Sequence, residues 1–180
     1  MFDAGVREFV AVDVGTDVPG EGRRGAPHLT LRFLGEVAAE RNDAIARSLA
    51  EAARESPSFI LRLEGVGAFP TPARPRVVWV GVTRGRSDLV ELARRVRLAL
   101  EPEFGPDREE FVPHLTLFRV RSPRDRDAAS ELLSGARPPP PPREVAVDEL
   151  LLKESILGPR GADHRTLASF RLAGGRTATA

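Results

Sequence analysis

The sequence predicts an α+β protein of two lobes that share one site. Strand-like runs alternate with amphipathic helical stretches along the chain, which is the pattern of an α+β fold. The pentapeptide Pro-His-Leu-Thr-Leu occurs at residues 27–31 and again at residues 113–117, which indicates an imperfect internal duplication. No segment has the composition of a separating linker, so we expect residues 1–180 to form a single bilobal domain.

The first part of the chain predicts two strands and a helix. Residues 8–14 and 28–34 are apolar or alternating runs of strand length, and the Gly-rich segment between them, residues 16–26, has no helical period. Apolar residues at helical spacing predict a helix over residues 38–55, which Ser56-Pro57 ends.

The next part predicts a strand pair and a second helix. The runs FILRLEGVGAF and RVVWVGV have strand character, and the breaker PTPARP joins them. We expect Phe69 and Trp79 in the core of these strands, and a turn at Gly65 to Gly67 where the first strand ends. An apolar stripe at helical spacing then predicts a helix over residues 88–100.

The last part adds three strands and a weaker helix. The strand EEFVPHLTLFRV carries the second pentapeptide, and a helix near residues 125–133 follows it. Five consecutive prolines then form an extended connection, because proline neither donates a ladder hydrogen bond nor continues a helix. The runs EVAVDELLL and RTLASFRL predict the two final strands.

Composition excludes several kinds of function. The formal net charge is only +1, so overall electrostatics favours neither nucleic acid nor an anionic membrane, and any anion site must be local. The absence of cysteine excludes disulfides, thiolate metal sites and a cysteine nucleophile. The N-terminus carries acidic residues and only a strand-length apolar run, so we expect neither a signal peptide nor a membrane span, and a cytoplasmic location.

The two copies of His-x-Thr are the strongest functional signal. Residues two apart in a strand face the same side, so His28 and Thr30 project together, as do His114 and Thr116, while the leucines between them face the core. If the lobes are related by a pseudo-two-fold axis, two imidazoles and two hydroxyls flank one point. This set suits acid–base catalysis at phosphorus, because an imidazole populates both protonation states near neutrality.

The sequence resembles the 2H phosphoesterases, and within them the RNA 2',3'-cyclic phosphodiesterases, also described as 2'-5' RNA ligase-like proteins. The segments that carry the resemblance are, in family order, HLTLRFLGEV, LEGVGAFP, ARPRVVWVGV, FVPHLTLFRV and LLKESILGPRGADHRTLASFRL. The resemblance implies a bilobal fold of two antiparallel sheets, with helices on their outer faces and the active cleft between them. It also implies hydrolysis of a terminal cyclic phosphate to a 2'-phosphomonoester without metal or cofactor, with His28 as proton donor and His114 as proton acceptor.

The resemblance also implies the binding partners of the protein, and the sequence departs from the family pattern at three places. The expected partners are RNA 3' ends with a 2',3'-cyclic phosphate, or small cyclic nucleotides, bound to a monomer with Thr30 and Thr116 on the phosphate. The segment between Gly15 and Pro27 is shorter than in the family, Glu109 stands where an arginine is common, and His164 replaces a common tyrosine.

Other roles remain open at this point. Arg32, Phe118 and Arg119 follow the histidines closely and are possible substrate contacts, and alternation puts Phe118 on the histidine face. We expect His164 to lie in a loop, solvated or locally hydrogen-bonded. Metal binding by the two motif histidines is the less favoured alternative, because neither motif has a carboxylate at ligand spacing. A non-catalytic RNA-end or nucleotide-binding protein and a 2'-5' RNA ligase are the rival functions.

Overall fold

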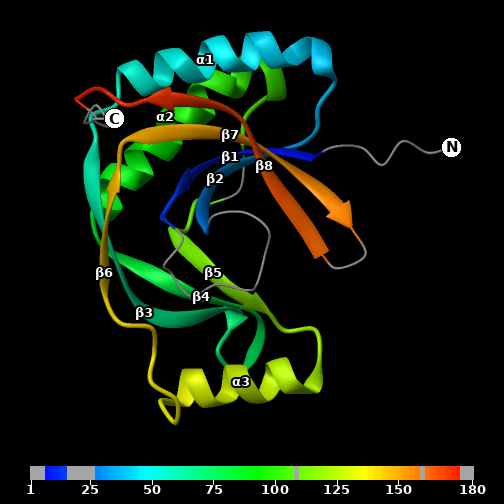
Figure 1. Ribbon diagram of the computed structural model, residues 1–180, viewed down its shortest axis with the longest axis vertical. Helices are drawn as coiled ribbons and strands as arrows, with labels where there is room; N and C mark the ends of the chain where they lie inside the picture. The colour runs from blue at the N-terminus through cyan, green and yellow to red at the C-terminus, as the bar shows by residue number, and fades with distance from the viewer. Residues whose placement is uncertain (1–6, 16–26, 108–109, 159–160, 175–180) are drawn as a thin grey trace, which may run out of the picture.

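The computed structural model consists of two four-stranded antiparallel sheets with three α-helices (Figure 1). It describes residues 7–15, 27–107, 110–158 and 161–174, without the side chains of residues 157, 158 and 161. The shortened segment 16–26 and the position of Glu109 lie outside the described residues. The elements are β1 (Arg7–Asp13), β2 (His28–Glu36), a 3-10 turn (Ala39–Arg41), α1 (Asn42–Arg54), β3 (Phe59–Thr71), β4 (Arg74–Arg84), α2 (Arg86–Phe104), β5 (His114–Arg119), α3 (Pro123–Ser134), β6 (Arg143–Val147), β7 (Glu149–Gly158) and β8 (Gly161–Arg171).

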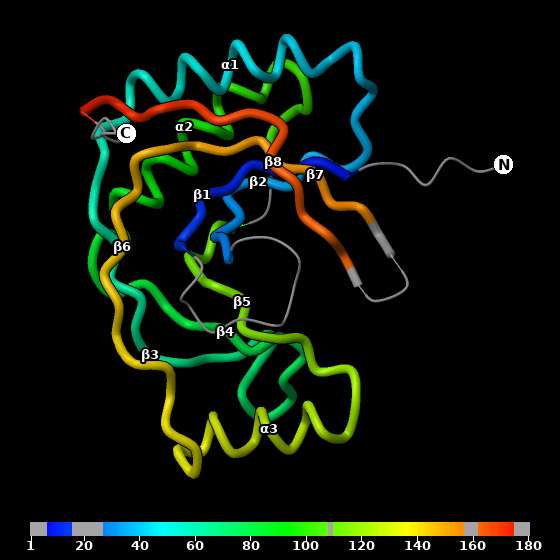
Figure 2. Tube along the Cα trace, viewed as in Figure 1, coloured from blue at the N-terminus to red at the C-terminus, as the bar shows by residue number. Residues whose placement is uncertain are grey.

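Each sheet has one His-x-Thr strand at an edge. The first sheet has the order β2-β1-β7-β8 and the second the order β5-β4-β3-β6, so β2 and β5 are both edge strands. These two edges contact each other, and Figure 2 shows the chain trace of β5 next to that of β2. The expected bilobal α+β architecture is confirmed, with the two motif strands meeting where the sheets adjoin.

The chain leaves the second sheet and enters the first within a run whose sequence predicts one continuous strand. The run EVAVDELLL is divided at Asp148 between β6, which pairs with β3, and β7, which pairs with β1. The prediction of a single strand there is wrong because the two halves of the run hydrogen-bond to different partners. Both ends of the chain therefore build the first sheet, and the middle builds the second.

The helices cover the outer faces of the sheets. Helix α1 packs against α2, β7 and β8, α2 also packs against β2, and α3 covers β3 and β4 at the opposite end of the molecule (Figure 1). The apolar stripe of α2 is fully buried, as its periodicity predicts, and the helix continues beyond residue 100 to Phe104. None of the helices in the described ranges is long and apolar enough to cross a membrane.

One cluster of buried apolar side chains connects both sheets and all three helices. Leu29 and Leu31 of β2 enter it from the first sheet, and Leu115 and Leu117 of β5 from the second. These are the alternate residues of the two pentapeptides, so the burial of the leucines turns the histidines and threonines to the other face. The local geometry that the sequence predicts for both motifs is therefore present.

Candidate active site

The two motif histidines occupy equivalent places in the two sheets. His28 is the first residue of β2 and His114 is the first residue of β5, and each is partly buried with its threonine two residues later. Each histidine also contacts an aromatic side chain from another strand of its own sheet. The structure thus builds two similar half-sites, which differ in the groups that surround the imidazole.

The His114 imidazole is held in one tautomer. Its Nδ1 lies 2.7 Å from the carbonyl oxygen of Val112, and because a carbonyl can only accept, Nδ1 is the nitrogen that donates. Burial lowers the pKa of His114, the hydrogen bond to Val112 opposes that shift, and the nearby positive charge of Arg119 adds to it. The neutral ring therefore presents an unprotonated Nε2, which is what a proton acceptor at neutral pH requires.

Two aromatic rings fix the orientation of the His114 ring. Phe69 lies edge-to-face with it at a centroid distance of 4.9 Å, and Trp79 lies 6.5 Å from it and 5.3 Å from Phe69. The expectation that Phe69 and Trp79 are simple core residues is wrong, because both are only partly buried and both line this half-site. These rings keep the imidazole in a largely apolar setting, which explains the direction of its pKa shift.

Gly67 makes the place of Trp79 possible. It pairs with Trp79 across β3 and β4, and a Cβ added at Gly67 would overlap the six-membered ring of the indole. The glycine lies inside β3 and does not end it, so the predicted strand-end turn at Gly65 to Gly67 is not present. A strand glycine can mark the close approach of another group, and here that group is an aromatic ring.

The His28 imidazole lies in a different cluster. Phe9 of β1 lies 5.0 Å from it, and His164 of β8 also lies 5.0 Å from it in an edge-to-face arrangement. His164 is partly buried within a strand, so the expectation of a loop histidine is wrong. The sequence gives little sign that His164 belongs to this site, because its contact with His28 depends on how β8 is placed relative to β2.

A buried ion pair lies on the same face of the first sheet. Asp13 is the register partner of His28, and the Nζ of Lys153 donates to both of its carboxylate oxygens at 2.8 and 3.0 Å. The Lys153 side chain is only 3% exposed, and it is the single lysine in the sequence. A buried ammonium of this kind needs its partner, so the pair ties β1 to β7 beside the histidine.

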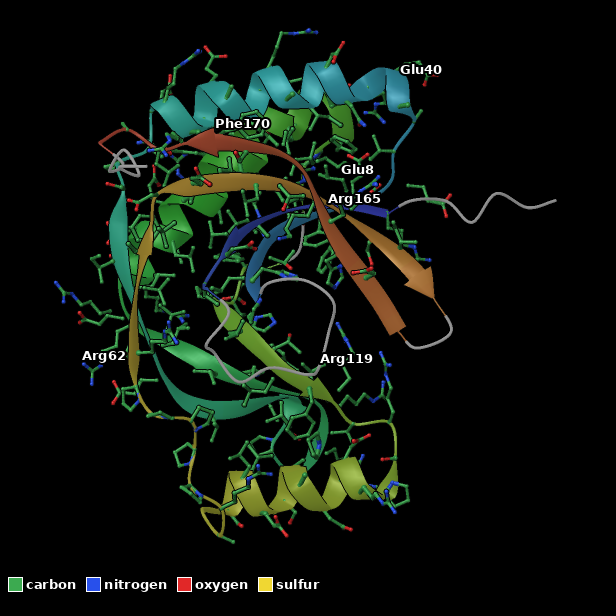
Figure 3. All side chains as sticks on the ribbon, in the orientation of Figure 1. Glu8, Glu40, Arg62, Arg119, Arg165 and Phe170 are labelled. Atoms are coloured by element: carbon green, nitrogen blue, oxygen red, sulfur yellow. The ribbon has the colours of Figure 1, made fainter. Side chains whose placement is uncertain are left out.

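Of the three other predicted substrate contacts, Arg119 lies near the site, whereas Phe118 and Arg32 point away from it. Arg119 is exposed at the end of β5, and its charge acts on His114. In Figure 3 its side chain extends from β5 toward the first sheet.

Phe118 does not follow the two-residue alternation of β5, because the strand has a bulge. Thr116 pairs with Trp79, but Phe118 pairs with Val78. Phe118 therefore packs on the core, and the expectation that it lies on the histidine face is wrong.

Arg32 serves the fold. It is 5% exposed, and its guanidinium donates to the carbonyl oxygens of Arg97 and Gly105 at 2.9 and 2.8 Å, near the end of α2. Both terminal nitrogens are thereby engaged away from the histidine face. We do not retain Arg32 as a substrate contact.

The surrounding groups define what the site can bind. A pocket of about 500 Å³ adjoins the histidine face at Asp13, and its lining residues are Asp13, Ala146, Val147, Asp148, Glu149, Leu151, Thr166, Ser169 and Arg171. Among the described residues, no three histidine, aspartate or glutamate side chains are grouped to hold a metal ion. The donors that the two half-sites offer are imidazoles, hydroxyls and the Arg119 guanidinium.

The fold and the paired His-x-Thr strands are the features that the resemblance to the 2H phosphoesterases implies. The chain belongs to the 2'-5' RNA ligase superfamily, whose family model matches residues 13–155. A curated protein from Aeropyrum pernix named RNA 2',3'-cyclic phosphodiesterase is 39% identical over 155 residues, which is 81% of this chain and 82% of that protein. A protein of the same name from Thermotoga maritima is 33% identical over 188 residues, 94% and 97% of the two chains.

Solved structures agree with this assignment. The crystal structure of Escherichia coli LigT complexed with phosphate matches with a TM-score of 0.65 and 30% sequence identity, over 95% of this chain and 99% of that one. The resemblance inferred from the motifs is confirmed.

Proposed function

We propose that this protein hydrolyses the 2',3'-cyclic phosphate at RNA 3' ends, or in small cyclic nucleotides, to a 2'-phosphomonoester. The observation that carries the proposal is the His-x-Thr strand at the adjoining edge of each sheet. The hydrogen bond from His114 Nδ1 to Val112 supports it, because it leaves Nε2 of the neutral ring free of a proton. The names of the Aeropyrum and Thermotoga relatives support the same substrate.

The proposed reaction is a single displacement at phosphorus. The Nε2 of His114 takes a proton from water as the water oxygen bonds to phosphorus, and the bond from phosphorus to O3' breaks. Protonated His28 gives its proton to O3', so the leaving group departs as a hydroxyl. The product keeps the phosphate on O2', and both histidines exchange protons with solvent before the next cycle.

The threonines and Arg119 are proposed to stabilise the charge that develops on the phosphoryl oxygens. Thr30 and Thr116 each lie two residues from a histidine on the same strand, so their hydroxyls reach the same region as the imidazoles. Donors held in place before the reaction stabilise the transition state without reorganisation. This assignment needs no metal ion or cofactor, and metal independence is part of the proposal.

A second function follows from the family to which the chain belongs. Its model is described as the 2'-5' RNA ligase superfamily, and ligation of a 5' hydroxyl to a cyclic phosphate is the same displacement with an RNA hydroxyl replacing water. The same base and acid serve it, so an assay that supplies RNA with a free 5' hydroxyl tests it directly.

Turnover of 2',3'-cyclic AMP to 2'-AMP tests the proposal. We expect hydrolysis that is unchanged in excess EDTA, and a loss of about 10²- to 10⁴-fold in kcat for His28→Ala or His114→Ala. The double variant should be little worse than the poorer single one, because acid and base act in one displacement. Thr30→Ala and Thr116→Ala should lose less, whereas the exposed control Arg84→Gln should lose nothing.

Three outcomes would overturn parts of this assignment. Stoichiometric binding of the nucleotide without product would support a non-catalytic binding protein. Formation of 3'-AMP would require the opposite bond to break. Loss of activity in EDTA with recovery on adding zinc or manganese would make the histidines metal ligands.

A further inference from the structure

Phe9, His28 and His164 form a closed cluster of three rings. The centroid distances are 5.0 Å between Phe9 and His28, 5.2 Å between Phe9 and His164, and 5.0 Å between the two imidazoles. Phe9 is 2% exposed, so it is a fixed support for both histidines. The proposed proton donor therefore has a second imidazole as its direct neighbour.

The curvature of the first sheet brings His164 to this position. His164 is the register partner of Ser155 on β7, and β1 and β7 both lie between its strand and β2 in the sheet order. In the view of Figure 1 the ribbons of β7 and β8 overlap those of β1 and β2. The contact itself is given by the two imidazoles, which meet edge to face at an angle of 85°.

The two half-sites differ in this respect. His114 contacts Phe69 and Trp79, which do not change charge near neutrality, whereas His28 contacts Phe9 and a histidine. A second imidazole can take up a proton in the same pH range as the first. The proton donor is thus the histidine whose charge state depends on its neighbour.

Other charged groups on this face are largely compensated. Lys153 of β7 is paired with Asp13 of β1, so together they bring little net charge toward His28. On β8, the exposed Arg165 is bonded to the buried Glu154 of β7, so these two charges also compensate each other. The other titratable or charged groups near the pair are Asp163 beside His164, and His114 and Arg119 of β5.

We infer that the ionisation of His28 is coupled to that of His164, which makes His164 a positioning residue for the proposed acid. Two imidazolium ions with ring centres this close repel each other, so the second proton binds less readily than the first. Over the pH interval between the two steps the pair carries a single charge. The inference rests on the proposed function only in calling His28 the acid, because the coupling itself is independent of turnover.

Imidazole NMR of the full-length protein tests the coupling. The sequence contains only three histidines, so a ¹⁵N-labelled sample gives three imidazole spin systems, which His28→Ala, His114→Ala and His164→Phe assign. We expect His28 and His164 to show the same two titration steps, separated by more than about one pH unit. In His164→Phe, which keeps a ring, His28 should titrate in one step near the upper of the two.

Two further variants make the result decisive. His164→Gln should give the same single step, so that a distortion caused by phenylalanine is not mistaken for uncoupling. Thr166→Val, two residues along β8 on the same face, removes no titrating group and should leave both steps in place. One step for His28 with an unchanged midpoint in the wild type and both His164 variants would overturn the inference.

Turnover of 2',3'-cyclic AMP in the same samples separates this result from the proposed function. Two shared steps in a protein that forms no 2'-AMP would remove the function and leave the coupled pair. Normal turnover with an uncoupled His28 would remove the coupling and leave the function.

Discussion

His114 and Val112 are joined by a hydrogen bond of 2.7 Å from the imidazole Nδ1 to the backbone carbonyl. The bond joins two residues of one segment, and Phe69 and Trp79 hold the imidazole in the orientation that it requires. This bond leaves Nε2 as the unprotonated nitrogen of the neutral ring, which is the atom that the proposed mechanism uses as the base. The pH dependence of turnover is therefore a test of this assignment.

Arg119→Gln should move the low-pH limb of the activity profile upward. The proposed mechanism uses neutral His114 as the base, so kcat/KM should fall as pH drops through the pKa of that residue, which burial and then Arg119 hold below the ordinary value. Removing the positive charge makes protonation easier and raises this pKa. The midpoint of the limb should rise in Arg119→Gln and stay in place in the exposed control Arg121→Gln; a midpoint unchanged in both would contradict the electrostatic role.

Gly67→Ala should disturb catalysis through Trp79. The new methyl group would occupy the space of the indole ring, which must shift and take its contact with His114 with it. We expect kcat/KM to fall by about tenfold or more, since small misplacements of a catalytic group are costly. The single tryptophan reports the shift by fluorescence.

Gly65→Ala is the matched control for this prediction. Gly65 has φ near 76°, so alanine there is strained, but its Cβ would meet no neighbour. It should lower the free energy of unfolding without changing the tryptophan emission. Equal emission changes in both variants would show that strain in β3, and not overlap with the ring, is responsible.

The sequence predicts this site well where the argument is local. Two-residue alternation places His28 with Thr30 and His114 with Thr116, because the leucines between them must be buried. It fails at Phe118, because the bulge that reverses the face of this residue depends on pairing with β4. Local periodicity contains no record of such a partner.

Tertiary contacts determine the features of the fold and the site that local periodicity does not predict. Two-residue alternation would put Arg32 on the histidine face, but a register shift in the pairing of β2 with β1 turns it inward, where it donates to two carbonyl oxygens. His164 belongs to the site only because the first sheet is curved, and the break at Asp148 exists because β6 and β7 pair with different strands. In each case the determining partner is distant in sequence.

Arg32→Met should lower stability and spare catalysis. The change leaves the carbonyl oxygens of Arg97 and Gly105 without their donor, and a bond from a charged donor contributes about 2 kcal/mol. Urea unfolding should show a loss of this size, whereas kcat/KM of the folded protein should stay within about twofold of wild type. A large fall in kcat/KM with normal stability would instead return Arg32 to the substrate.

Lys153→Met should be among the more destabilising single changes on the first sheet. It leaves the Asp13 carboxylate without its cation in a partly buried place, and breaking such a pair costs about 3 kcal/mol. Adding Asp13→Asn should restore part of the loss, because the uncompensated charge is then gone. Glu144→Gln, which breaks the exposed pair with Arg84, should cost less than about 1 kcal/mol in the same urea assay.

Glu8→Gln should stabilise the protein at neutral pH. Glu8 is 4% exposed, and burial raises its pKa, with a further contribution from Glu154 that a hydrogen bond with Asn42 opposes. One Glu8 oxygen and the Asn42 amide oxygen are both buried without a hydrogen-bond partner among the described residues. Both are acceptors, so a proton on Glu8 or the amide of a glutamine supplies the missing donor.

The raised pKa fixes the sign of the pH effect. The folded state binds the Glu8 proton more tightly than the unfolded state, so this stabilisation is complete below the unfolded-state pKa and is lost as pH rises through the folded-state value. Urea unfolding of Glu8→Gln should therefore show a gain over wild type at neutral pH that shrinks at about pH 4. Glu51→Gln, an exposed change in α1, should show no such pH-dependent gain, and a Glu8→Gln protein that is less stable than wild type at neutral pH would mean that the charged carboxylate is the favoured form.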